Sequence, residues 1–246
     1  MIHRPPERLK LLETALFLDF DGTLVRFDRP DRSVPVVDAG LRSLVVELLG
    51  ALDGALAIIS GRALDALDDL FAPLRLAAAG EHGSAWRIAP DAPQQSIDVS
   101  TDLRALPAAC RALLVRFPGV GLEVKPNSLV LHYHGQPGVR DELARAVGQL
   151  CLGQTGMTLL HARGMLEIKS ADADKGAAIR RFMDHVPFAG RTPAFVGDDI
   201  TDEDAFVAIN ALGGISVKVG AGPSHARFRL EHDGAVRDWL EGLLRA

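Results

Sequence analysis

Two acidic residues stand two positions apart at the end of an apolar run near the start of the chain. The run Ala15–Phe20 contains Asp19 and leads directly into Asp21, Gly22 and Thr23. Residues at this spacing in an extended strand point the same way, so both carboxylates can face one site. Two such carboxylates repel each other unless a cation or a shared proton lies between them. The pattern indicates a cation or phosphate site, in which Gly22 turns backbone N–H groups toward an anion, with an ordinary Asp-Gly turn as the alternative.

A second polar cluster, Ser60-Gly61-Arg62, follows the apolar run at residues 55–59. A hydroxyl at a strand end can donate a hydrogen bond to a phosphoryl oxygen, and Gly61 and Arg62 are further candidates for substrate contact. Alternatively, Ser60 caps a helix expected over Ala63–Phe71. Both roles can hold together, because helix N-termini favour anions.

The third cluster is unusually acidic. The apolar run Pro193–Val196 leads into GDDITDED, in which five of the seven residues from 198 to 204 are acids. A hard cation with oxygen ligands would explain this density. The alternative is a helix start enriched in acids, which accounts for Asp202 and the acids after it but not for the pair Asp198 and Asp199.

Lys175 stands where a helix over Ala177–Phe182 is expected to begin. A lysine at a helix N-terminus works against the helix dipole. We therefore expect Lys175 to answer negative charge elsewhere in the fold, with an ordinary surface lysine as the alternative.

The elements that must position these clusters are short buried strands. The runs before all three clusters are apolar on both faces, which is typical of parallel strands covered by helices. Residues 36–52 carry a helical apolar stripe between two of these runs, which indicates a βαβ unit. With a further strand at Ile215–Val219 and a helix near Val236–Leu244, we expect an α/β fold with a doubly wound, Rossmann-like parallel sheet. Such sheets bind ligands at the carboxyl ends of their strands.

The middle of the chain has a different pattern. From about Trp86 to Leu166 it predicts a helix, two strands, a helix and two more strands. We interpret residues 86–166 as an inserted α+β domain, and residues 1–85 with 167–246 as the α/β core that it interrupts.

The composition excludes several classes of protein. The chain has 246 residues, 48% of them apolar, and a net charge of −5, which argues against a nucleic-acid or anionic-membrane surface built on bulk charge. No apolar run reaches the ~18 residues of a membrane span, and the N-terminus lacks a signal-peptide profile. The two cysteines fit neither a disulfide framework nor a zinc site. We expect a soluble, cytoplasmic monomer.

Taken in order, the motifs Asp-x-Asp-Gly-Thr, Ser-Gly-Arg, Lys-Gly and Gly-Asp-Asp resemble the haloacid-dehalogenase superfamily of phosphatases. The long gap between Ser60 and Lys175 is where large-cap members of that superfamily insert a cap domain. A narrower resemblance to the trehalose-6-phosphate phosphatases covers nearly the whole chain. It is carried by residues 80–83 (GEHG), 123–125 (EVK), 131–133 (LHY), 167–169 (EIK) and 190–230. Two positions depart from that family, since His134 stands in place of its usual Arg and Ser170 in place of its usual Pro.

The resemblance implies a role for each acidic residue of the core. Asp19 would be the nucleophile that takes the phosphoryl group, and Asp21 would protonate the leaving sugar oxygen and then deprotonate water. One Mg²⁺ would bind Asp19, the backbone carbonyl of Asp21 and Asp198. Asp199 and Asp202 would support the lysine and the waters of the metal.

The resemblance also implies groups that bind the substrate. Phosphoryl oxygens would be held by Lys175, Ser60 and the N–H groups of Gly22 and Thr23. The cap would select the sugar through Glu123, Lys125 and Glu167, whose alternative interpretation is a solvated, charged strand face.

The implied reaction is hydrolysis of trehalose 6-phosphate, with sucrose-, mannosylglycerate- or hexose-phosphate as alternative small-molecule substrates. A phospho-acceptor signalling module would also gather acids, a hydroxyl and a lysine at strand ends, but it is usually shorter and needs neither the insert nor Asp21. A non-catalytic sugar-phosphate sensor would bind without releasing phosphate, and the intact set of motifs argues against it.

Overall fold

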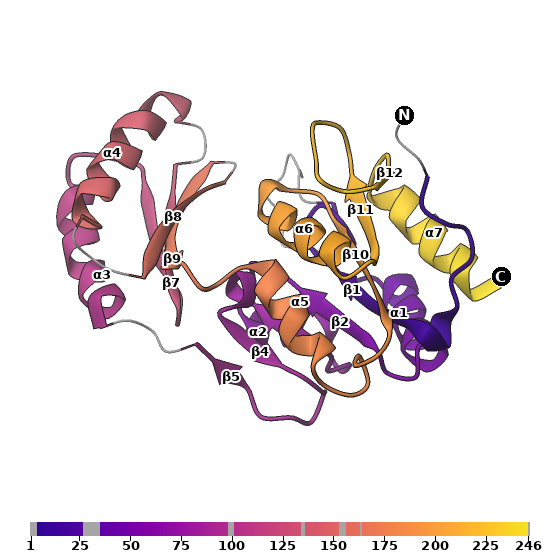
Figure 1. The fold of residues 1–246 in the computed structure, drawn as a ribbon. Helices are drawn as coiled ribbons and strands as arrows, with labels where there is room; N and C mark the ends of the chain where they lie inside the picture. Colours follow the sequence, from indigo (N-terminus) through magenta and orange to yellow (C-terminus); the bar gives the residue numbers. More distant parts are fainter. Residues whose placement is uncertain are drawn as a thin grey trace. The chain divides into compact units, whose positions relative to one another are not determined.

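The computed structural model describes residues 4–26, 35–97, 101–133, 136–152, 156–162 and 164–245. The chain divides into two compact units (Figure 1). The first unit comprises Met1–Gln95 and Asp174–Ala246, and the second comprises Ser96–Ala173. Each unit has its own apolar core.

A predominantly parallel sheet forms the centre of the first unit. Its strands lie in the order β12-β11-β10-β1-β2-β3-β4-β5, in which β3 and β4 pair antiparallel. Their bounds are β1 (Thr14–Leu18), β2 (Leu56–Ile59), β3 (Ala77–Gly80), β4 (Ala85–Arg87), β5 (Gln95–Ser96), β10 (Thr192–Gly197), β11 (Ile215–Val219) and β12 (Phe228–Leu230). The central strands β1 and β2 are buried along their whole length. This agrees with the α/β sheet expected from runs that are apolar on both faces.

Helices flank this sheet. They are α1 (Ala39–Ala51), α2 (Leu64–Phe71), α5 (Lys175–Met183), α6 (Glu203–Ala211) and α7 (Asp233–Arg245), with short 3₁₀ turns η1 (Leu11–Glu13), η2 (Glu81–Gly83) and η4 (Ile200–Asp202). Helix α1 packs against α7, and α5 packs against α6. None of the helices in the described part of the chain combines the length and the apolar character that a membrane crossing needs.

Aromatic packing ties β1 to α5. The ring of Phe17 on β1 stacks at 5.4 Å on Phe188 and meets the edge of Phe182 on α5 at 5.9 Å. Such pairs contribute about 0.5–1.5 kcal/mol beyond the area that they bury. The packing holds the helix that begins at Lys175 against the strand that leads into Asp19.

The second unit is an antiparallel sheet with two helices. The strands β6 (Gly121–Val124), β7 (Ser128–His132), β9 (Met165–Ser170) and β8 (Met157–Ala162) lie in that order. The helices are α3 (Thr101–Leu114) and α4 (Arg140–Leu150), and η3 (Pro137–Val139) precedes α4. Alternate residues of the sheet, including Leu129, Leu131, Leu166 and Ile168, form its core together with residues of both helices. The expected hairpin of β6 and β7 is confirmed.

The limits of the units differ from those expected from the sequence at 85/86 and 166/167. Strand β4 pairs with β3, which keeps the chain in the first unit as far as Gln95. Strand β9 pairs with β7 and β8 along its whole length, so it lies entirely in the second unit and cannot be divided at residue 166. The departure from the family at His134 lies outside the described residues.

Candidate active site

The ends of three adjacent strands bring distant acidic and polar residues to one edge of the sheet. Strand β1 pairs in parallel with β10 on one side and β2 on the other, and Leu18 is in register with both Val196 and Ile58. Asp19 follows β1 directly, and its N–H donates to the Val196 carbonyl at 2.9 Å. Asp198 and Ser60 follow β10 and β2. These predicted site residues therefore meet where doubly wound sheets bind ligands.

Lys175 joins two buried carboxylates. Its Nζ donates to Asp19 Oδ1 and to Asp202 Oδ1, each at 2.6 Å. The lysine is 2% exposed, Asp19 is 4% exposed and Asp202 is fully buried. The expectation that Lys175 answers negative charge is confirmed, and the surface-lysine alternative is wrong. The adjoining Asp174 caps α5 by accepting from the Ala177 N–H at 2.6 Å.

Asp202 braces the acidic loop after β10. Its Oδ2 accepts from the N–H groups of Asp198 at 2.8 Å and Asp199 at 2.9 Å. The side chain of Asp199 is exposed and caps the turn by accepting a hydrogen bond from the backbone N–H of Asp202. Of the two residues expected to support Lys175, the structure gives Asp202 that contact, whereas the carboxylate of Asp199 is used in the turn.

Asp19, Asp198 and Asp202 each bring one carboxylate oxygen to within 4.8 Å of the others, the only such group among the described residues. Carboxylate oxygens are the ligands that Mg²⁺ prefers, so the donor chemistry fits the ion expected from the sequence. Both oxygens of Asp202 already accept hydrogen bonds. Asp19 and Asp198 are therefore the better candidates for ligands, and Asp202 is better described as a brace.

The concentration of buried negative charge raises two pKa values. Burial raises the pKa of Asp19 well above its usual value, although Lys175 acts in the opposite direction. Burial and the neighbouring Asp202 carboxylate raise the pKa of Asp198 to about 6. For Lys175, burial acts to lower the pKa, but the adjoining Asp19 and Asp202 carboxylates raise it above its usual value. Since three carboxylates meet here, a bound cation would relieve the remaining repulsion.

Gly22 lets the carboxylate of Asp198 approach the loop after β1. Its backbone has φ = 87°, and a Cβ built there would lie 2.1 Å from Asp198 Oδ2. The N–H of Gly22 donates to the Val25 carbonyl at 2.7 Å, and that of Thr23 to the Phe20 carbonyl at 3.4 Å. This corrects the expectation that both N–H groups are available to a phosphate, because the turn itself uses them. The Thr23 hydroxyl instead donates to Asp198 Oδ1 at 3.4 Å.

Arg62 binds Asp21 through two parallel hydrogen bonds. Its Nε donates to Asp21 Oδ2 at 2.6 Å, and the other guanidinium contact is 2.7 Å. Bidentate pairs of this kind fix orientation as well as adding energy. The structure thus brings Arg62 onto the carboxylate of Asp21.

Ser60 is buried and its Oγ accepts from the Arg62 N–H at 3.2 Å. It does not cap α2, which begins at Leu64 without a side-chain cap.

Gly61 accommodates a histidine that sequence reasoning did not single out for the site. A Cβ at Gly61 would lie 2.7 Å from two atoms of the His82 ring. His82 and Glu81 have φ values of 56° and 49°, in the left-handed region that few side chains adopt. Backbone bonds from Glu81 N–H to the Arg62 carbonyl and from His82 N–H to the Ser60 carbonyl hold this turn. The structure therefore assigns Gly61 to close packing.

Lys218 is a second residue that sequence reasoning missed. It is buried on β11, and its Nζ donates to the backbone carbonyl of Asp198 and, at 2.7 Å, to that of Val219. Its charge acts to lower the pKa of Asp198. The available signal was a charged residue within the mostly apolar strand Ile215–Val219.

The three residues expected to select a sugar lie on or directly after two strands of the second unit, β6 and β9, which are separated by β7. Glu123 is on β6, Lys125 follows it, and Glu167 is on β9. Lys125 Nζ lies 3.6 Å from Glu167 Oε1. Glu167 is buried, whereas the Glu123 side chain is half exposed. These groups lie together on one face of the sheet, as the interpretation requires.

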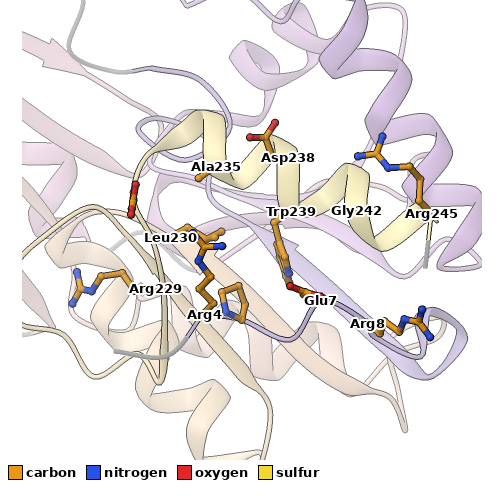
Figure 2. A pocket seen from close by; sticks show the side chains of 12 residues that line it. Arg4, Glu7, Arg8, Arg229, Leu230, Ala235, Asp238, Trp239, Gly242 and Arg245 are labelled. Carbon is orange, nitrogen blue, oxygen red and sulfur yellow. The ribbon is translucent and has the colours of Figure 1, made fainter. Parts of the chain in front are cut away.

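A cavity of about 770 Å³ opens elsewhere in the first unit, between the N-terminal segment and α7. Figure 2 shows Trp239 and the arginines Arg4, Arg8, Arg229 and Arg245 around it. None of the predicted site residues lines it, so the candidate active site is the cluster at the strand ends.

Comparisons with known proteins show which family the chain is similar to. A family model described as trehalose-phosphatase matches residues 17–233. The trehalose-6-phosphate phosphatase of Escherichia coli K12 is 38% identical over 240 residues, which cover 94% of this chain and 87% of that protein. The C-terminal domain of trehalose-6-phosphate phosphatase from C. albicans has a TM-score of 0.84 at 19% identity, covering 100% and 98% of the two chains. A haloacid dehalogenase-like hydrolase from B. subtilis has a TM-score of 0.65 at 15% identity, covering 94% and 99%. The last two similarities confirm the expected fold.

Proposed function

Because this chain belongs to the trehalose-phosphatase family of phosphomonoester hydrolases, we propose that it hydrolyses trehalose 6-phosphate to trehalose and phosphate. The observation that carries the proposal is the buried Asp19 carboxylate, which Lys175 holds beside Asp198 at the edge of the sheet, in a chain that matches that family over residues 17–233.

The substrate is tested by phosphate release from a panel of sugar phosphates. We expect trehalose 6-phosphate to be hydrolysed with a higher kcat/KM than sucrose 6-phosphate, mannosylglycerate phosphate or glucose 6-phosphate. A preference for one of the other three sugar phosphates would mean that the chain is a phosphatase with a different substrate.

In the proposed first step, a carboxylate oxygen of Asp19 attacks phosphorus and the bond from phosphorus to the sugar oxygen breaks. Asp21 donates a proton to the departing oxygen, which leaves trehalose and an aspartyl-phosphate. In the second step, water attacks the same phosphorus while Asp21 accepts its proton, and Asp19 is released. The hydrogen bond from Lys175 holds Asp19 Oδ1, so the carboxylate meets the substrate in a defined orientation.

Mg²⁺ would be held by Asp19, Asp198 and the backbone carbonyl of Asp21. When bound, it would supply positive charge that offsets the repulsion between a carboxylate and a phosphate dianion. Ser60 and Lys175 would donate to the phosphoryl oxygens. Arg62 would hold Asp21 in line with the leaving oxygen through the two bonds of 2.6 and 2.7 Å.

Metal removal is expected to make the stability of the protein fall as pH rises. The folded-state pKa of Asp198, about 6, lies above the ordinary value of an aspartate, so the folded state retains a proton that the unfolded state has released. The metal-free protein should therefore lose up to about 3 kcal/mol from this group between about pH 4 and 6. Mg²⁺ should raise the melting temperature more at pH 7.5 than at pH 5, by about 2–4 °C for every kcal/mol. Equal gains at both pH values in thermal melts would contradict a cation among these carboxylates.

Arg62→Met is expected to slow phosphoryl transfer from trehalose 6-phosphate more than from p-nitrophenyl phosphate. The sugar oxygen needs a proton to leave and nitrophenolate does not, so the loss of an oriented Asp21 should matter for the sugar alone. We expect a decrease of about 10²-fold in the single-turnover rate for trehalose 6-phosphate, as is typical when acid catalysis is lost. Arg62→Lys, which keeps the positive charge but cannot make the two parallel bonds, should recover part of it. Equal losses on the two substrates would contradict the role in orienting Asp21.

We further propose that the second unit selects the sugar through Glu123, Lys125 and Glu167. Glu123→Ala and Lys125→Ala should each raise KM for trehalose 6-phosphate about tenfold, as expected for a hydrogen bond to a charged group. Both should leave kcat/KM for p-nitrophenyl phosphate nearly unchanged. Glu142→Ala is the matched control, since this glutamate is an exposed residue of α4 in the same unit. Equal losses on both substrates would contradict selection of the sugar.

A further inference from the structure

Alternate residues of β7, the strand between β6 and β9, carry polar side chains on one face. Ser128, Val130 and His132 are spaced by two and therefore share a face. The intervening Leu129 and Leu131 point the other way and belong to the core of the second unit. Packing of the helices onto the sheet thus uses the leucines, whereas the opposite face carries polar side chains, of which Ser128 is buried and His132 is partly exposed.

The two glutamates proposed to select the sugar lie in one row on this face. Glu123 on β6 and Glu167 on β9 are both in register with Val130. Residues directly opposite each other on neighbouring strands share a face. Since adjacent strands lie about 4.8 Å apart, the backbones of the two glutamates are about 10 Å apart, one on each side of Val130.

The polar residues of β7 each hold one of these carboxylates. Ser128 Oγ donates to Glu167 Oε1 at 2.6 Å, and both atoms are buried. His132 Nε2 lies 2.8 Å from Glu123 Oε2. The two contacts run diagonally and in opposite directions from one strand. One strand therefore contacts both carboxylates, and Lys125 Nζ lies 3.6 Å from the same Glu167 oxygen.

We propose that Ser128 and His132 are positioning residues that hold Glu167 and Glu123 ready to accept hydrogen bonds from sugar hydroxyls. The inference rests on the proposed function and deepens it. A free glutamate loses rotamer freedom when it is ordered. A glutamate that is already held does not lose this freedom on binding, so the sugar binds more tightly. The effect falls on recognition of the sugar and not on transfer of the phosphoryl group.

The test compares His132→Phe, which keeps a ring but removes the contact, with His132→Gln, whose amide nitrogen can replace Nε2. Ser128→Ala removes the second contact. His161→Phe is the matched control, because this exposed histidine is on β8 of the same sheet and is in register with Leu166 of the core-facing side. KM and kcat are measured for trehalose 6-phosphate and for p-nitrophenyl phosphate, with inhibition by trehalose as a readout of binding alone.

We expect His132→Phe and Ser128→Ala each to raise KM for trehalose 6-phosphate and the inhibition constant of trehalose about tenfold. The double variant should show roughly the product of the two effects, about 100-fold, because the contacts involve different carboxylates. His132→Gln should recover much of the loss. The kcat for trehalose 6-phosphate and the kcat/KM for p-nitrophenyl phosphate should change less than about twofold.

If the wild-type enzyme hydrolyses trehalose 6-phosphate, two results would overturn this inference and leave the proposed function intact. One is that the variants behave as His161→Phe does. The other is that they lose activity on both substrates together with melting temperature, which would make the contacts structural. If wild-type protein releases no phosphate from trehalose 6-phosphate, the proposed function fails, and this inference fails with it.

Discussion

Asp19→Asn is expected to abolish release of phosphate from trehalose 6-phosphate while the fold survives. The amide cannot form the proposed aspartyl-phosphate, so turnover should fall by about 10⁴-fold or more, as when the nucleophile of a covalent mechanism is removed. The variant keeps the size of the side chain. It also removes one of the carboxylates that crowd the site, where burial already raises the pKa of Asp19.

Stability separates this outcome from simple unfolding. Lys175 keeps its 2.6 Å contact with Asp202 in the variant, so no buried charge is left alone. The melting temperature of Asp19→Asn should therefore equal or exceed that of wild type in the absence of metal. Asp53→Asn makes the same change at an exposed aspartate of the same unit, and it should retain full activity. Ordinary turnover by purified Asp19→Asn would refute the covalent route.

Lys175→Met is expected to damage both activity and stability. The ammonium is the shared partner of Asp19 and Asp202, and its removal leaves buried carboxylates without a counterion. Breaking a buried pair in this way costs about 3–5 kcal/mol. The loss of a donor to the phosphoryl group should lower kcat about 10²–10³-fold in the folded fraction.

The loss of stability expected for Lys175→Met depends on pH. Protonation of the Asp19 and Asp202 carboxylates, which have lost their counterion, relieves their repulsion. The melting temperature of Lys175→Met should therefore fall less below that of wild type at pH 5 than at pH 7.5. Lys10→Met, at a lysine whose side chain is 80% exposed, controls for the removal of a positive charge. If Lys175→Met unfolds at the wild-type temperature at both pH values, the buried ion pairs do not contribute to stability as described.

The architecture of the first unit could be predicted because its strands carry a strong local signal. Runs that are buried on both faces, such as Thr14–Leu18 and Leu56–Ile59, need helices on each side and hence parallel pairing. Once β10, β1 and β2 are adjacent, the acids and the hydroxyl that follow them must meet at one edge. The juxtaposition of Asp19 with Asp198 therefore follows from topology.

Partners that depend on side-chain direction could not be predicted in the same way. No spacing in the sequence indicates that Arg62 turns onto Asp21 or that the His82 ring packs against Gly61. The His82 contact depends on the left-handed turn after β3, which backbone bonds to the Ser60 and Arg62 carbonyls hold in place. The N–H of Gly22 was expected to be available to a phosphate, but it donates to the Val25 carbonyl at 2.7 Å, a local turn contact that the residue types alone do not specify.

The limits of the second unit show a related effect. Residues 165–170 lie next to the returning core in sequence, yet their partners are β7 and β8. The unit to which a strand belongs is decided by the strands with which it forms hydrogen bonds. The pairing of β9 with β7, which lies well before it in the sequence, leaves little trace in local composition. The same ladder puts Glu167 in the row of Glu123 and completes the face that we propose for the sugar.

The most direct test of the account measures phosphate release from trehalose 6-phosphate with Mg²⁺, after chelation with EDTA, and after Mg²⁺ is restored. Asp19→Asn prepared in parallel excludes a contaminating phosphatase. The account predicts rapid release with Mg²⁺, loss of release in EDTA, and recovery when excess Mg²⁺ is added. No release in the presence of Mg²⁺, or an unchanged rate in EDTA, would contradict it.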